Sequence, residues 1–156
     1  MPTLGVDSYV DLIYADAYFL KKLHKSAWDE AFDYQRSAAL FEAAIRIDRL
    51  NFRGAKTDSG QTLEWPRINT RFDDDEIPND IKIANCEIAY ALLDGVDPDL
   101  EHENLAAVAE GASSMRTTYS RMLVPEHFSA GIPSHLAWLH LKPHLADVRR
   151  IKLRRV

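Results

Sequence analysis

Apolar positions near the start of the chain recur at helical spacing. Within residues 8–23 they form one face of a predicted helix, with Asp11 placed to cap its first turn. The face consists of Leu12, Ala15, Phe19 and Leu23. A second, shorter helical turn is expected over 26–32, where Trp28 and Phe32 lie four residues apart and share one side. We expect this turn to cover the core.

The clearest amphipathic pattern spans residues 33–51. Asp33 is the expected cap, and the pair Glu42 and Arg46 has the favourable i,i+4 spacing. The apolar face contains Leu40, Phe41, Ala44, Ile47 and Leu50, and the polar stripe contains Gln35, Glu42, Arg46, Arg49 and Arg53. The sequence therefore predicts a helix that packs on one side, followed by a loop.

A third long helix is predicted over 77–95, with Pro78 in its first turn and Gly95 just past its end. Between residues 83 and 93 only Asn85 and Glu87 are strongly polar. A helix that is apolar nearly all round must be covered on nearly all sides, which a small helical domain has difficulty doing alone. We therefore expect a neighbouring copy of the chain to complete its cover.

The remainder of the chain has weaker periodicity. Residues 101–131 predict an arm or β-hairpin extension, and residues 132–156 predict a short closing helix ended by Pro143 and followed by a basic tail. Residues 1–100 form the helical core domain in this interpretation. The predicted fold class is mainly α, a small helical bundle with an extended, partly β arm.

The stretch GQTLEWPR, residues 60–67, places Trp65 on a loop bounded by glycine and proline. A large aromatic side chain at such a position either folds back onto its own domain or points outward for a partner to cover. The sequence leaves both alternatives open.

Charge divides the chain into two parts. Residues 1–141 carry 13 basic and 23 acidic side chains, a net charge of −10, whereas residues 142–156 carry six basic and one acidic, a net charge of +5. The first part repels nucleic acid at long range, and the tail attracts phosphates or an acidic protein surface. No aromatic residue is interleaved with the tail cations to stack on bases.

Candidate chemistry is sparse. His140 and His144 have the spacing of a helical metal pair, but Pro143 intervenes and no glutamate follows the first histidine as in zinc proteases. The acidic run 73–76 lacks the alternation and glycine of a calcium loop, and Cys86 lies on the apolar helix as a core residue. Phosphate-binding loops and nucleophile elbows are absent from the sequence. We therefore expect a non-enzymatic protein with no metal and no cofactor.

Targeting and membrane signals are also absent from the sequence. No run approaches 18 apolar residues, and MPTLGVDSYV lacks the pattern of a signal peptide. We expect synthesis in the host cytoplasm and no membrane partner.

Several blocks occur in one order: SYVDLIYADAYF, SAALFEAAIRIDRL, QTLEWPR and IPNDIKIANCEIAYALLDGVDP. This order resembles a family of tailed-phage and prophage proteins, often labelled DnaT-like single-stranded-DNA-binding, whose virion members are similar to head-tail connectors, also called adaptors. The resemblance covers residues 8–98 and weakens after Asp99.

The resemblance implies a structural adaptor in the neck of a virion, at the head-tail interface. Its expected partners are sister copies in a ring, commonly twelvefold, the portal protein above, and the next tail component below, a nozzle or stopper protein. Genomic DNA would pass through the lumen during ejection without sequence-specific binding. The alternative function is a single-stranded-DNA-binding replication protein.

A ring subunit needs two different contact surfaces, which the apolar third helix and the Trp65 loop would supply. The candidate inter-subunit or partner contacts are Trp65, Pro66, Arg67, Ile83, Tyr90, Tyr119, Trp138, Arg149, Arg150, Lys152, Arg154 and Arg155.

Overall fold

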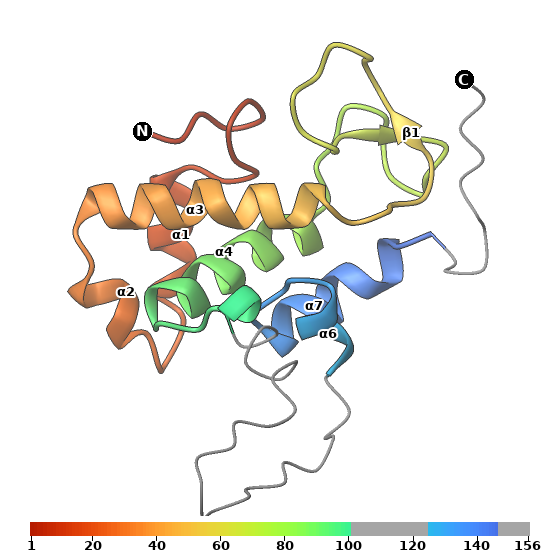
Figure 1. The fold of residues 1–156 in the computed structure, drawn as a ribbon. Helices are drawn as coiled ribbons and strands as arrows, with labels where there is room; N and C mark the ends of the chain where they lie inside the picture. Colours follow the sequence, from red (N-terminus) through yellow and green to blue (C-terminus); the bar gives the residue numbers. More distant parts are fainter. Residues whose placement is uncertain (101–124, 147–156) are drawn as a thin grey trace, which may run out of the picture.

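The computed structural model describes residues 1–100 and 125–146 of the 156-residue chain. The helices are α1 (Leu12–Phe19), α2 (Ser26–Glu30), α3 (Asp33–Asp48), α4 (Asn79–Leu93), α6 (Glu126–Ser129) and α7 (His135–Leu141), with a 3₁₀ turn η1 (Lys142–His144). Two short strands, β1 (Ala55–Lys56) and β2 (Arg67–Ile68), pair antiparallel. The fold is mainly α, as predicted, and Figure 1 shows its arrangement.

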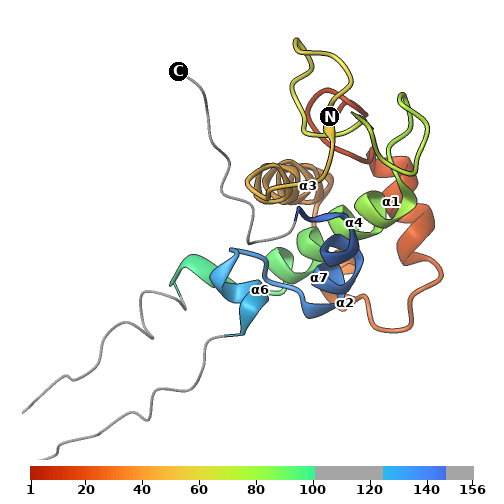
Figure 2. The same cartoon turned by 90° about the vertical axis from the view of Figure 1, so that its right-hand side faces the viewer.

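Helix α4 is the centre of the molecule. It contacts α1, α2, α3 and α7, and in Figure 2 it runs between α3 on one side and α1 on the other. Most of its apolar residues and Asn85 are buried by these neighbours, whereas Ile83, Tyr90, Leu92 and Leu93 are half-buried. The chain therefore covers most of α4 itself, and the contribution of a second copy stays a prediction. Four helices of the same chain provide the cover. One of them, α7, comes from the C-terminal segment, which the sequence pattern placed outside the core domain.

Local signals position the helix ends as predicted. The Asp11 side chain accepts a hydrogen bond from the Tyr14 backbone N–H at 2.8 Å and caps α1. Gly95 follows α4 with a φ of 87°, the left-handed conformation that ends many helices. At α3 the cap differs, because Phe32 is the N-cap residue and its N–H donates to Gln35 Oε1 at 2.9 Å. Asp33 is instead the first residue of α3.

Two side-chain predictions for α2 and α3 are wrong. Phe32 does not share the buried face of Trp28, because α2 ends at Glu30, and the phenyl ring is 67% exposed. Arg46 lies on the predicted polar stripe, yet it is buried and donates to the Gly131 carbonyl at 2.9 Å. Its predicted pairing with Glu42 is confirmed at 3.0 Å.

The C-terminal elements pack into the same core as the first 100 residues. Ile132, Ala137 and Leu141 belong to one buried cluster with Ile47 and Ile88. The predicted closing helix is confirmed as α7, with Ser134 as its cap. Most of the predicted arm, 101–124, lies outside the described residues, and its described end, 125–131, is α6 and a turn.

None of the helices in the described ranges is long and apolar enough to cross a lipid bilayer.

Candidate functional site

The loop that carries the GQTLEWPR stretch folds back onto the protein. Trp65 is 1% exposed and contacts the rings of Phe52, Phe72 and His144, with centroid distances of 5.6, 6.4 and 5.5 Å. The alternative in which Trp65 points outward for a partner to cover is therefore wrong. The aromatic neighbours come from three separate segments, so the indole ring joins the loop, the chain after α3 and the C-terminal turn.

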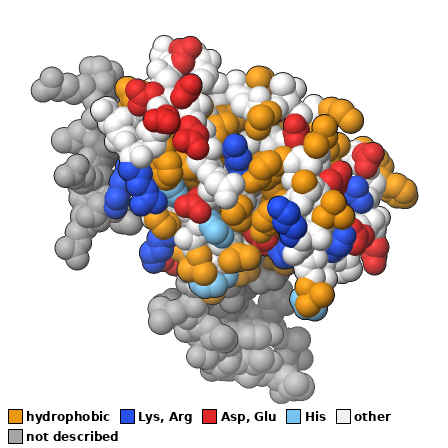
Figure 3. Space-filling model, turned by 180° about the vertical axis from the view of Figure 1, so that it is seen from behind, with side chains coloured by type: hydrophobic (Ala, Val, Ile, Leu, Met, Phe, Trp, Pro, Cys, Tyr) orange, Lys and Arg blue, Asp and Glu red, His pale blue; other side chains and the backbone are white. Residues whose placement is uncertain are grey.

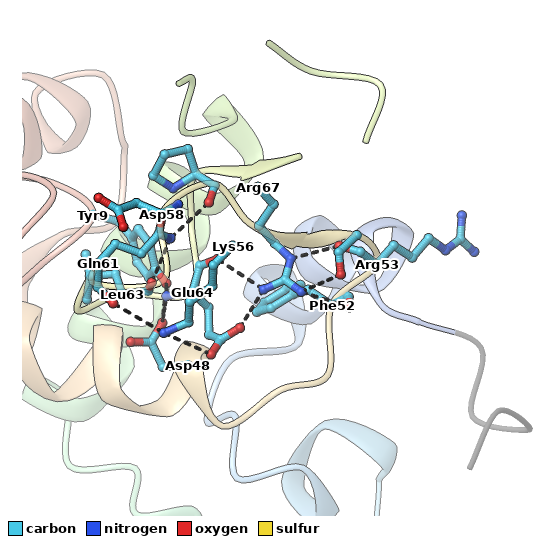
Figure 4. Close-up of polar contacts among 12 residues, drawn as sticks. Tyr9, Asp48, Phe52, Arg53, Lys56, Asp58, Gln61, Leu63, Glu64 and Arg67 are labelled. Atoms are coloured by element: carbon cyan, nitrogen blue, oxygen red, sulfur yellow. Dashed lines mark hydrogen bonds and ion pairs between the residues drawn. The ribbon is translucent and has the colours of Figure 1, made fainter. Parts of the chain in front are cut away.

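Arg67 is also structural rather than a partner contact. Its guanidinium is buried and donates to the carbonyls of Arg53 and Gly54 at 2.8 and 2.9 Å, and it pairs with Glu64 at 2.5 Å (Figure 4). These bonds satisfy carbonyl groups of the turn before β1. Gly54 has a φ of 76°, and a Cβ atom there would lie 2.2 Å from the Ile68 carbonyl oxygen. The turn therefore requires both the arginine and the glycine.

The rest of the loop is held in the same way. Gln61 Nε2 donates to the carbonyls of Leu63 and Pro66 at 2.9 Å each, and the Tyr9 hydroxyl donates to Asp48 (Figure 4). Burial, with the nearby Asp48 carboxylate, raises the pKa of Tyr9, so this hydroxyl stays protonated as a donor. The GQTLEWPR stretch therefore has a structural role: its contacts hold the loop against the rest of the protein.

The two histidines of the C-terminal segment share one carboxylate. His140 Nδ1 lies 3.0 Å from Asp80 Oδ1, and His144 Nε2 lies 3.1 Å from Asp80 Oδ2. Burial alone would raise the pKa of Asp80, but hydrogen bonds from both rings outweigh it and lower the pKa. His144 is 5% exposed, whereas His140 is half-buried. The cluster ties α7 and η1 to the first turn of α4.

Within the described ranges, no group of three or more His, Cys, Asp or Glu side chains is arranged to hold a metal ion. Cys86 is buried on α4 as predicted, and burial raises the pKa of its thiol.

The neighbouring Glu87 is 3% exposed, receives a hydrogen bond from Tyr18, and lies 2.6 Å from Lys22 Nζ. Sequence reasoning missed this ion pair of a partly exposed lysine with a buried carboxylate, because the partners lie 65 residues apart.

The remaining predicted contacts divide into three groups. Trp138 is 6% exposed and belongs to the core, so it is not a free partner contact. Pro66, Ile83 and Tyr90 are half-buried. Tyr119 and the tail residues Arg149, Arg150, Lys152, Arg154 and Arg155 lie outside the described residues.

Several apolar side chains that the sequence pattern did not predict to be exposed lie at the surface. On the outer side of α1 and the loop after it, Ile13, Leu20 and Leu23 are 81%, 75% and 87% exposed. Figure 3 looks onto this face, where hydrophobic side chains alternate with charged ones. Ile13 and Leu20 are seven residues apart, so they lie on one face, opposite the buried Ala15 and Phe19. Helix α1 is therefore apolar on both sides.

A second exposed group lies at the start of α3. The rings of Phe32 and Tyr34 are 67% and 70% exposed and stack at 5.9 Å with an interplanar angle of 9°. A cleft of about 290 Å³ lies between α2 and the end of α4, and its lining includes Ala31 and Gln35, the sequence neighbours of these two residues. The lining also includes Ala27, Glu30, Leu93 and Asp94.

The described surface is acidic. Residues 1–100 and 125–146 contain 12 Lys and Arg against 20 Asp and Glu, a net charge of −8. Seven of these twelve cations are in ion pairs: Lys22, Lys25, Arg36, Arg46, Lys56, Arg67 and Lys142. Five of the twelve cations in the described ranges therefore form no ion pair there.

Comparison with known proteins gives one match. The model of the family described as "Putative DnaT-like ssDNA binding protein" matches residues 2–133. No curated protein and no solved structure matches the chain. The match extends beyond the blocks at 8–98 and covers most of the 156 residues. The chain therefore belongs to the DnaT-like family.

Proposed function

We propose that this protein is a non-catalytic structural subunit that binds protein partners, and specifically the adaptor ring of a tailed phage. The observation that carries the proposal is the outer face of α1, where Ile13, Leu20 and Leu23 are exposed. Strongly exposed apolar side chains on one side of a folded domain are a feature of protein interfaces. The family match does not support this proposal, because its description concerns single-stranded DNA and favours the second function given below.

The charge of the described residues supports the same function. A net charge of −8, with most cations already paired, gives a surface that does not hold phosphates by counterion release. Such a surface suits a channel through which DNA slides. It does not suit a groove that retains DNA.

The mass of the purified protein, alone and mixed with its cognate portal protein, tests the proposal. We expect a ring of copies on the portal, and a single subunit alone agrees with this if the portal templates assembly. A mixture that contains only free protein and free portal at micromolar concentration contradicts the proposal.

The family match favours a second function of another class, the binding of single-stranded DNA. Five Arg and Lys residues within 149–155 could neutralise phosphates, and the exposed rings of Phe32 and Tyr34 could stack on bases. Fluorescence anisotropy of a labelled 30-nucleotide oligonucleotide tests it. Submicromolar binding that weakens with salt supports this function, and no saturation at 10 µM protein in low salt contradicts it.

A further inference from the structure

The end of the molecule that contains α2 and the start of α3 combines three features. The cleft of about 290 Å³ includes the apolar residues Ala27, Ala31 and Leu93 in its lining. Glu30 and Asp94 line the same cleft, and within the described residues neither side chain forms an ion pair. The rings of Phe32 and Tyr34 are exposed next to Ala31 and Gln35. We call this the aromatic-acidic end.

The electrostatic field at the cleft favours a cation. Asp94 directly follows the last residue of α4, so the cleft also faces the carbonyl end of a 15-residue helix. That end carries partial negative charge, which adds to the two carboxylates. Asp29 and Asp33 are also on this end, although they pair with Lys25 and Arg36.

Arginine matches all three features better than other side chains do. Its planar guanidinium stacks on aromatic rings and donates two hydrogen bonds to a carboxylate. Its three-carbon stem packs on apolar surface while the charge stays in water. Lysine shares the stem and the charge but lacks the flat donor geometry.

The chain itself contains an arginine-rich segment of this kind. Five of the seven residues in 149–155 are Arg or Lys, whereas the described residues carry a net charge of −8. We propose that residues 149–155 of one copy bind the aromatic-acidic end of a second copy. The partner is thus another molecule of this protein, and the ligand is its arginine side chains.

The last described residue and the aromatic-acidic end lie at opposite ends of the molecule (Figure 1). Ala146, the last described residue, donates its N–H to the Asn51 carbonyl at 2.8 Å, just beyond the C-terminal end of α3. The aromatic-acidic end lies at the N-terminal end of the same helix, which has 16 residues and is therefore about 24 Å long. Figure 1 shows α2 and the end of the blue segment on opposite sides of the molecule. A contact between opposite ends is head to tail, as a ring requires.

This inference rests on the proposed assembly of the protein with copies of itself and identifies one of its contacts. A fluorescein-labelled peptide of residues 147–156 is titrated into the full-length protein, followed by anisotropy. The test variants are Glu30→Gln with Asp94→Asn, and Phe32→Ala with Tyr34→Ala. The matched control is Asp73→Asn with Asp75→Asn, which removes the same charge from exposed positions elsewhere. A peptide with its five Arg and Lys residues replaced by Gln is the control for the ligand.

We expect saturable binding that weakens at least tenfold in both test variants, remains within twofold in the control variant, and is lost with the Gln peptide. Circular dichroism must show unchanged melting of each variant, because all four substituted side chains lie at the surface. Equal weakening in test and control variants overturns the inference, because binding is then general charge attraction. Failure of the peptide to bind overturns it too. If rings still form on the portal in either case, the proposed function stands without this contact.

Single-stranded DNA is the other ligand that Phe32 and Tyr34 could take. An unlabelled oligonucleotide is therefore added to the protein-peptide complex. The result counts only if the oligonucleotide binds the protein and does not bind the free peptide. If such an oligonucleotide releases the peptide from the wild-type protein, the assignment of this end to arginine is contradicted. Retention of the peptide supports it.

Discussion

The ring of Trp65 lies edge-on to the ring of His144, with centroids 5.5 Å apart and an interplanar angle of 89°. This contact joins the family motif to the last turn before the basic tail. His144 in turn hydrogen-bonds Asp80 on α4, and its carbonyl accepts the Arg53 N–H at 3.0 Å. The motif loop, the central helix and the root of the tail therefore form one packed unit.

Trp65→Ala is expected to lower the free energy of unfolding by about 3–5 kcal/mol, because the buried indole leaves a large cavity. Urea unfolding followed by circular dichroism measures this loss. Leu139→Ala is the control, since Leu139 is 54% exposed and its loss should change stability by about 0.5 kcal/mol or less. Equal effects of the two substitutions would show that Trp65 is not part of the core.

Asp80 is expected to make stability depend on pH. The pKa of Asp80 is lowered in the folded state, so the unfolded state binds its proton more readily and stability from this group rises with pH. This contribution is complete above the unfolded pKa of about 3.9 and is lost as pH falls through the lower, folded pKa. Urea midpoints between pH 6 and pH 3 measure it.

Asp80→Asn should flatten that dependence and cost about 1 kcal/mol at pH 7, a modest value because the side chain is 37% exposed and screened by solvent. Asp58→Asn, on an exposed loop, is the matched control. An unchanged pH profile in Asp80→Asn would contradict the role of the histidine pair.

The pair of Lys22 and Glu87 is expected to behave as a unit. Lys22→Met leaves the Glu87 carboxylate buried without its cation and should cost about 2–4 kcal/mol. Adding Glu87→Gln to Lys22→Met should recover most of that loss, because no charge then remains buried. A double-mutant cycle by thermal unfolding measures the coupling, and additive effects would argue against it.

The exposed face of α1 is expected to matter for assembly and not for folding. Ile13→Ser with Leu20→Ser should leave the free energy of unfolding within about 0.5 kcal/mol, because both side chains are at least 75% exposed. The same variant should abolish ring formation on the portal, as seen by sedimentation velocity. Ile45→Ser, on the exposed side of α3, is the control and should assemble normally.

The sequence predicted the helices because their signals are local. Apolar spacing, the Asp11 cap and Gly95 each act within a few residues, and each lies where the structure uses it. The orientation of Trp65 could not be predicted, because its neighbours Phe52 and His144 come from distant segments. The pairing of His140 and His144 with Asp80 spans 60 and 64 residues and left no pattern in the sequence.

The predicted excess of apolar surface illustrates the same limit. Composition indicated that α4 needed more cover than a small domain provides, and it could not show that α7 supplies it. Strongly exposed apolar side chains lie on other elements, among them Ile13 of α1, a helix that is only eight residues long and packs on one side. Apolar spacing alone does not distinguish a short helix with apolar residues on both faces from an ordinary amphipathic helix.

Competition between the two proposed partners tests the central claim most directly. Labelled full-length protein is mixed at 150 mM salt with its cognate portal and a 30-nucleotide single strand that has a second label, and the mass of every labelled species is measured. We predict that the protein enters one portal-bound species of fixed stoichiometry and that the oligonucleotide remains free. Protein that binds the oligonucleotide at submicromolar concentration and leaves the portal bare would contradict the claim.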